Sequence, residues 1–341
     1  MENKQQRALT KIALTPKGRE RAKLLQDDDF RKLVLSSGAN VTIYSGEIDL
    51  SATTPSKKLE NIQIGLIQRK NKKGKFDGLG ALGGLAERTN EAYFNQLSEE
   101  EKLNLIGQKD DVILQDGKPI LTTDINIIRK NNVLREMREE LENLNIFDIT
   151  IDSSKLELIP MNKVKDDNYM INIWDGNGEC FAITPYCHLY KDEDGLIDTI
   201  NQNAKEQIGG EASEYKKVPL LKALSSYGNM TKSEHALEDG RDALKDYRYP
   251  HEYLASWALA SKLLEHDDNQ MIELAKSVQQ NANHLISFEK IASSSSIEMK
   301  DIAEILKIKP ETLNKMEEAF KNTFSQNKQI LQNHKFNSSQ R

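Results

Sequence analysis

Three glutamates in the middle of the chain have a spacing that suits metal chemistry. Glu136, Glu139 and Glu140 are three and four residues apart, so a helix would project their carboxylates to one side. Like charges at these spacings repel one another by roughly 0.2–0.5 kcal/mol per pair. A divalent cation would remove this repulsion, because carboxylate oxygens suit Mg²⁺ or Mn²⁺. The alternative is an acidic face that is only solvated, and the spacing alone leaves both interpretations open.

The stretch that carries these glutamates, Asn131–Leu144, has the pattern of an amphipathic helix. Its apolar residues recur at three- and four-residue steps, which predicts a stripe that packs against the rest of the fold. The stripe consists of Val133, Leu134, Met137, Leu141 and Leu144. We expect Thr123 or Asp124 to cap the N-terminus of this helix.

A second segment with functional character lies upstream of this helix. Leu59–Lys70 has the alternating pattern of a strand, and a polar turn follows it. Then comes the glycine-rich segment Gly78–Glu87, which predicts a loop where the backbone can approach a ligand closely.

Together the two segments resemble the Nudix hydrolase family, whose box reads G-x5-E-x7-R-E-U-x-E-E-x-G-U, with U an aliphatic residue. Arg135–Glu140 matches the R-E-U-x-E-E core at every specified position, and Gly83–Glu87 matches the G-G-x-x-E opening. Two features depart from the pattern. About forty residues separate the halves of the box. In addition, Glu142 stands where the box has its last glycine, and Asn90 where it has its first isolated glutamate.

The resemblance implies an α+β fold, namely a Nudix-type α/β/α sandwich with a mixed sheet. It also implies Mg²⁺-dependent (or Mn²⁺-dependent) hydrolysis of a phosphoanhydride bond in a nucleoside diphosphate-linked substrate, such as ADP-ribose or a dinucleotide. In that reading the metal is held by Glu136, Glu139 and Glu140, which are also catalytic. Arg135 belongs to the catalytic group as well, by fixing a neighbouring carboxylate through bidentate pairing.

Residues on the substrate side follow from the same resemblance. They are Gly83 and Gly84, whose backbone would lie near the diphosphate, and Glu87. The leaving group stays open between ADP-ribose, a dinucleotide, a dinucleoside polyphosphate and a nucleoside triphosphate. A rival hypothesis from another class is a non-catalytic Nudix module that senses a nucleotide or binds a protein, and the split box would suit it.

The insertion between the halves of the box, about residues 90–126, has elements of its own. Ser98 begins a capping-box pattern, and 112–121 resembles a hairpin with Asp116-Gly117 at its turn. Tyr93 and Phe94 either stack on a nucleobase or pack against the fold. The insertion is either a surface excursion or a lid over the substrate. We expect it to affect substrate choice and not the chemistry.

The sequence as a whole predicts three regions: an N-terminal helical arm (1–40), a Nudix-like domain (41–228) and a mainly α-helical C-terminal domain (229–341). Strand patterns at 147–151, 156–159, 169–174 and 181–190 supply a mixed sheet, and Glu214–Leu224 is typical of a strand followed by a helix. His188 and Cys187 lie in one of these patterns, and we expect both to be structural.

The C-terminal region is expected to bind a protein partner or a second copy of the chain. Residues 301–316 have the pattern of two short helices around a turn, which resembles the helix-turn-helix of a DNA-binding regulator. However, six acidic residues meet eight basic ones between 297 and 341, which is not the dense basic face that DNA contact requires. We therefore expect an ordinary helical hairpin and no DNA binding.

Composition narrows the class of protein further. The net charge is −6 and the mean hydropathy is −0.64, values that argue against general nucleic-acid binding and against a membrane protein. No run approaches the ~18 apolar residues of a membrane span. The first residues lack the apolar segment of a secretory signal, and two cysteines do not make a disulfide framework. We expect a cytoplasmic location.

Overall fold

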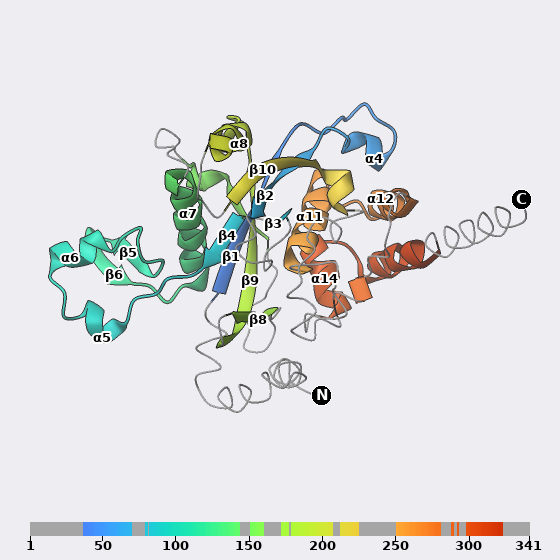
Figure 1. Ribbon diagram of the computed structural model, residues 1–341. Helices are drawn as coiled ribbons and strands as arrows, with labels where there is room; N and C mark the ends of the chain where they lie inside the picture. Colours follow the sequence, from blue (N-terminus) through green and yellow to red (C-terminus); the bar gives the residue numbers. More distant parts are fainter. Residues whose placement is uncertain are drawn as a thin grey trace, which may run out of the picture.

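The computed structural model describes residues 37–69, 79–80, 82–143, 151–159, 172–176, 179–206, 212–224, 250–280, 288–289, 292 and 298–322. These residues form an α+β structure in which one large mixed sheet has helices on both sides (Figure 1). The expected N-terminal arm lies outside them except for its last four residues, as does the strand pattern at 147–150.

The sheet contains eight strands among the described residues. Its strand order is β10-β2-β1-β9-β7, with β3 beside β2, β4 beside β1 and β8 beside β9. Only β1 and β9 run parallel among these pairs, and the other neighbours are antiparallel. The bounds are β1 Ser37–Ser45, β2 Gln63–Arg69, β3 Leu79–Gly80, β4 Leu82–Leu85, β7 Leu156–Ile159, β8 Asn172–Gly176, β9 Glu179–Lys191 and β10 Ala212–Pro219.

The glycine-rich segment is partly strand, where a loop was expected. Strand β2 pairs with only the last three residues of β1, from Ile43 to Ser45. The first half of β1 therefore has a free edge, and β4 fills it in antiparallel register, with Gly83 opposite Asn40 and Gly84 opposite Ala39. This pairing fixes the backbone of both glycines within the sheet.

Two helices cover one face of the sheet. Helix α7, Ile125–Asn143, packs over β1 and β4, and helix α8, Leu196–Glu206, packs against β10. Val133 and Met137 of the predicted apolar stripe are buried here against Val41, Ile43 and Leu82, which confirms this part of the stripe. The side chains of Leu141 and Leu144 lie outside the described ones.

The C-terminal helices cover the opposite face. They are α11 (Pro250–Leu263), α12 (Asp268–Gln280), α14 (Met299–Leu306) and a further helix at 310–322. Helix α11 contacts β1 and β9, and one hydrophobic core joins Ile64 and Leu189 of the sheet to Trp257 of α11. We expected the C-terminal helices to form a separate packing unit. Instead they share this core with the sheet, because they bury the apolar side chains on the face opposite α7 and α8. The domain boundary expected near residue 229 lies outside the described residues.

The insertion extends away from the sheet beside α7 (Figure 1). It contains α5 (Glu91–Phe94), α6 (Glu99–Asn104), β5 (Val112–Gln115) and β6 (Lys118–Leu121). The predicted capping box at Ser98 is present, with Glu101 as its partner. The predicted hairpin is also confirmed: Asp116 and Gly117 have φ of 50° and 77°, the left-handed values that a two-residue turn requires. Two further short helices are α4 (Pro55–Lys58) and the 3-10 helix Ser153–Lys155. Residues 220–224, directly after β10, are also helical, which confirms the strand and helix expected over Glu214–Leu224.

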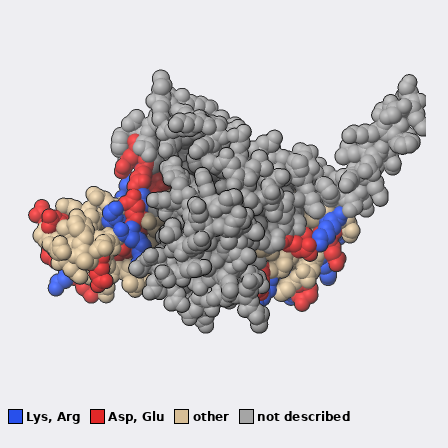
Figure 2. Space-filling view, turned by 60° about the horizontal axis from the view of Figure 1, so that its bottom comes forward, with Lys and Arg blue, Asp and Glu red and all other residues tan. Residues whose placement is uncertain are grey.

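Two helices joined by a short turn are present near the C-terminus, as both the expected helical hairpin and the helix-turn-helix alternative require. Helix α14 ends at Lys307, which adopts the left-handed conformation (φ 53°), and the next helix begins at Pro310. On this second helix the exposed charged residues are Glu311, Lys315, Glu318 and Lys321, two of each sign. Figure 2 likewise shows acidic and basic side chains interspersed at this end of the molecule, rather than a basic face. In the part of the chain described, no helix combines the length and apolar character that crossing a membrane would need.

His188 and Cys187 are both buried in β9, as expected for structural residues. The side chain of His188 is on the α7 side of the sheet near Arg129 and Lys130, and its Nδ1 has no hydrogen-bond partner among the described atoms. Burial, with the positive charges of Arg129 and Lys130, lowers the pKa of His188 to about 4.

This depressed pKa predicts a loss of stability in acid. The unfolded chain takes up the His188 proton near pH 6.5, and the folded chain resists it until about pH 4. The stabilising contribution is therefore present above pH 6.5 and is lost as the pH falls towards 4, by about 3 kcal/mol at most. We expect the unfolding free energy of His188→Met, measured in urea, to fall less than that of the wild type across this range. Parallel pH profiles for the two proteins would contradict this assignment.

Candidate active site

Helix α7 delivers the predicted glutamates, and packing fixes its position. Asp124 caps it: its side chain accepts a hydrogen bond from Asn126 N at 2.9 Å, and its carbonyl accepts one from Ile128 N. The predicted cap at Asp124 is therefore confirmed. Because Val133 and Met137 anchor one face of the helix on the sheet, Glu136 is held close to the backbone of β4.

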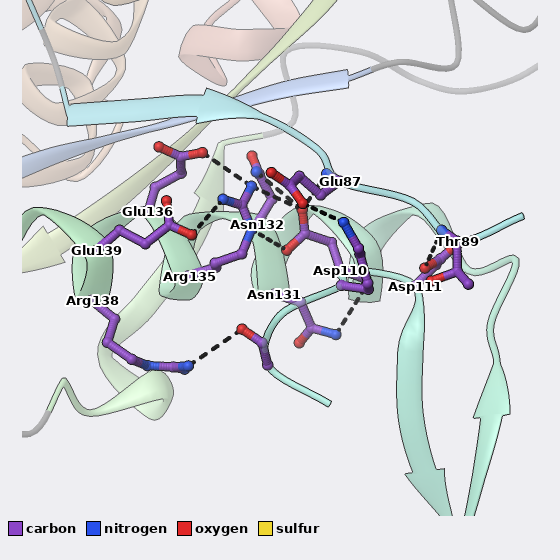
Figure 3. A network of polar contacts seen from close by, with 12 residues as sticks. Glu87, Thr89, Asp110, Asp111, Asn131, Asn132, Arg135, Glu136, Arg138 and Glu139 are labelled. Carbon is purple, nitrogen blue, oxygen red and sulfur yellow. Dashed lines mark hydrogen bonds and ion pairs between the residues drawn. The ribbon is translucent and has the colours of Figure 1, made fainter. Parts of the chain in front are cut away.

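Arg135 is the centre of the polar network on this helix (Figure 3). Its side chain is only 5% exposed, yet it touches three carboxylates. Nε and Nη2 donate to Asp110 Oδ1 and Oδ2 at 3.1 and 3.2 Å, which is the bidentate pairing expected of this arginine. Nη1 donates to Glu139 Oε1 at 3.0 Å, and Nη2 also lies 3.0 Å from Glu136 Oε1. Arg135 thus gathers two of the predicted metal ligands.

The bidentate partner, Asp110, comes from the insertion. Besides Arg135, its Oδ2 accepts hydrogen bonds from Glu87 N at 2.7 Å and from Asn132 Nδ2 at 3.2 Å. Its backbone N–H donates to Glu87 O at 2.8 Å, and its carbonyl accepts from Asn131 Nδ2 at 3.0 Å. The carboxylate is almost fully buried, so these donors replace the water that it gave up.

A second acidic residue of the insertion holds the segment that follows β4. Asp111 accepts hydrogen bonds from Thr89 N on both carboxylate oxygens, at 3.0 and 2.9 Å, and lies 3.8 Å from Arg88 Nε. Glu87, predicted on the substrate side, is half exposed and pairs with Lys109 Nζ at 2.6 Å. The insertion therefore ties the end of the glycine-rich segment to α7.

Glu136 lies directly over the backbone of β4. A Cβ built on Gly84 would fall on the Glu136 carboxylate, far inside van der Waals contact. Gly84 is thus required so that the strand and this carboxylate can approach each other. Gly83 lies beside it in the same strand, so both predicted glycines are next to the helix that carries the glutamates.

This close approach predicts a strong effect of one methyl group. In Gly84→Ala the added Cβ must displace the Glu136 side chain, because the backbone of β4 is held by its pairing with β1. We expect the divalent-metal affinity of the chain to fall about tenfold or more, as for other changes that disturb ligand orientation. Circular dichroism checks that the variant is folded. An Mn²⁺ affinity equal to that of the wild type would contradict the role given to Gly84.

Burial and neighbouring charges both shift the pKa values of the ionisable groups in this network. Burial raises the pKa of Glu136, and Arg135 opposes that rise. Burial likewise raises the pKa of Asp110, against the hydrogen bonds from Arg135. For Arg135 itself, burial lowers the pKa, but the hydrogen bonds that it donates to Asp110 and Glu139 outweigh burial and raise the pKa, so the guanidinium remains charged. The network therefore combines one fixed positive charge with several carboxylates.

Of the other predicted glutamates, the structure describes the side chain of Glu139 but not that of Glu140. Glu139 is half exposed, and the side chain of Glu140 lies outside the described ones, although its backbone belongs to α7. No group of three His, Cys, Asp or Glu side chains that could hold a metal ion occurs among the side chains described. Two of the three expected ligands, Glu136 and Glu139, nevertheless meet at Arg135 and present carboxylate oxygens, the donor type that Mg²⁺ and Mn²⁺ prefer.

Tyr93 and Phe94, the aromatic pair of the insertion, differ in burial. Phe94 is buried, with Lys102 Nζ 5.3 Å from the centre of its ring, so packing is its role here. Tyr93 is 54% exposed on α5. Of the two, only Tyr93 presents a ring to solvent where a nucleobase could stack.

Sequence reasoning missed Asp110, Asp111 and Asn132. The one available signal was the adjacent acidic pair at 110–111 directly before a hairpin, but its partners lie more than twenty residues away. No family model matches the chain, and no match was found among the curated proteins.

Proposed function

We propose that this protein hydrolyses a phosphoanhydride bond in a nucleoside diphosphate-linked substrate with the help of Mg²⁺ or Mn²⁺. The observation that carries the proposal is the convergence of Glu136 and Glu139 on Arg135, directly over the backbone of Gly84. These residues belong to the stretches that resemble the two halves of the Nudix box. A mixed sheet between helices, with the glycine strand beside the glutamate helix, supports a Nudix-type α/β/α sandwich.

Each residue has a stated part in this proposal. Glu136 and Glu139, together with Glu140, would hold the cation. When bound, a divalent cation neutralises charge on the diphosphate and lowers the pKa of the attacking water. Arg135 orients Glu136 and Glu139 through its own hydrogen bond and ion pair. The backbone of Gly83 and Gly84, which the Glu136 carboxylate approaches closely at Gly84, would lie beside the diphosphate.

An activity screen tests the proposal. The purified full chain is incubated with ADP-ribose, a dinucleotide, a dinucleoside polyphosphate and a nucleoside triphosphate, each with Mg²⁺, Mn²⁺ or a chelator. Products are separated by ion-exchange chromatography. We expect at least one nucleotide to be cleaved at a phosphoanhydride bond, and only with metal.

The screen also separates the proposal from its rival. Saturable nucleotide binding without any cleavage would favour a non-catalytic sensing module and would overturn the hydrolase. Cleavage that persists in the chelator would overturn the role of the metal. Neither binding nor cleavage of any of these nucleotides would overturn both functions.

A further inference from the structure

The insertion supplies the carboxylate that binds Arg135. Asp110 is almost fully buried and receives four donors: Arg135 Nε and Nη2, Glu87 N and Asn132 Nδ2. We expected the insertion to affect substrate choice and not the chemistry, and this contact also gives it a place in the polar network around Arg135. Figure 3 shows Asp110 between the segment at Glu87 and helix α7, at the centre of the polar contacts.

The charges around Arg135 give Asp110 a specific consequence. The guanidinium carries one positive charge and contacts Asp110, Glu136 and Glu139. Asp110 takes two of its nitrogens, and as a buried partner it balances that charge within a water-poor environment. Glu136 and Glu139 then retain net negative charge, which a cation requires. Without the Asp110 carboxylate, Arg135 would be neutralised by Glu136 and Glu139 and would compete with any metal there.

We infer that Asp110 of the insertion is a positioning residue that holds Arg135 and thereby leaves Glu136 and Glu139 free to bind a divalent cation. This inference rests on the proposed function, since it concerns the metal site of that function. It predicts that the insertion contributes to metal affinity, through Arg135, in addition to any influence on substrate choice.

A purely structural role of Asp110 makes a different prediction. If Asp110 only ties the insertion to α7, either single change breaks the same tie, so Asp110→Asn, Arg135→Gln and the double variant weaken Mn²⁺ binding to the same extent. If it acts by balancing the charge of Arg135, the second change relieves the first, because the uncompensated positive charge disappears. The double variant therefore distinguishes the two roles.

The experiment is a titration of the full-length chain with Mn²⁺, in which free Mn²⁺ is followed by electron paramagnetic resonance. The variants are Asp110→Asn, Arg135→Gln and the double variant, and circular dichroism checks that each is folded. Asp111→Asn is the matched control, since Asp111 is also buried in the insertion and accepts hydrogen bonds but is bonded to Thr89 instead of Arg135.

We expect Asp110→Asn to weaken Mn²⁺ binding about 10- to 100-fold, the usual range for a group that orients metal ligands. Asp111→Asn should stay within about threefold of the wild type, as expected for a group away from the ligands. The double variant should bind Mn²⁺ more tightly than Asp110→Asn alone. Unchanged affinity in Asp110→Asn, or a double variant that binds Mn²⁺ no more tightly than it, would overturn the inference.

Two further outcomes are informative. If Asp110→Asn does not fold, Asp110→Glu, which keeps the charge, takes its place. It should bind Mn²⁺ within about tenfold of the wild type, and a larger loss in a folded protein would overturn the inference. If the wild type itself shows no saturable Mn²⁺ binding, the proposed function fails and the inference with it. Wild-type binding that Asp110→Asn leaves intact overturns the inference alone.

Discussion

Glu139→Gln is expected to lower kcat/KM for the cleaved nucleotide by roughly two to three orders of magnitude, or several kcal/mol of transition-state stabilisation. The glutamine keeps nearly the same shape and can still accept the hydrogen bond from Arg135 Nη1. It loses the negative charge that holds a cation, so the loss should appear mainly in kcat. Glu140→Gln, at the adjacent position of the resemblance, is expected to be similarly damaged.

The matched control lies on the same helix. Glu142 is exposed near the end of α7 and stands where the Nudix box has a glycine, so Glu142→Gln should stay close to wild-type activity. Thermal unfolding of Glu139→Gln and Glu142→Gln should match that of the wild type, because both side chains are exposed. Activity of Glu139→Gln within about threefold of the wild type would show that this carboxylate holds no essential metal.

Trp257→Ala is expected to destabilise the whole fold by about 3–5 kcal/mol, the usual range for truncating a buried tryptophan. Trp257 is fully buried on α11, with ring centroids of Tyr253, Phe288 and Phe320 at 6.2, 5.6 and 5.9 Å. The same core continues into the sheet at Ile64 and Leu189. Removal of the indole should therefore loosen the sheet as well as the C-terminal helices.

The control for this variant keeps an aromatic ring. Trp257→Phe keeps an aromatic ring among Tyr253, Phe288 and Phe320 and removes much less buried volume than Trp257→Ala. We expect it to cost clearly less than Trp257→Ala in chemical denaturation. Hydrogen exchange should show β9 and α11 losing protection together in Trp257→Ala. Loss confined to the C-terminal helices would contradict the shared core.

The features that local patterns specify could be predicted from the sequence. The apolar stripe of α7, the capping box at Ser98 and the turn at Asp116-Gly117 each depend on residues a few positions apart. Bidentate pairing of Arg135 was also predicted, because guanidinium geometry suits a carboxylate. The identity of its partner was not.

The remaining features depend on contacts between distant segments. Asp110 is 25 positions from Arg135, and nothing in its spacing points to that partner. Strand β4 formed where a loop was expected, because an open edge of β1 accepts it. Likewise, the apolar pattern of α11 showed that the helix must be buried but did not show that the sheet would cover it. These outcomes follow from tertiary packing, which overrides local preference.

The central claim is that the glutamates of α7 hold a divalent cation beside the glycine strand. Anomalous diffraction from crystals of the full chain grown with Mn²⁺ tests it most directly. The account predicts an Mn²⁺ peak at the carboxylates of α7, including Glu136 or Glu139, and the loss of that peak in Glu139→Gln/Glu140→Gln. A fully occupied Mn²⁺ site elsewhere, with none at α7, would contradict the claim.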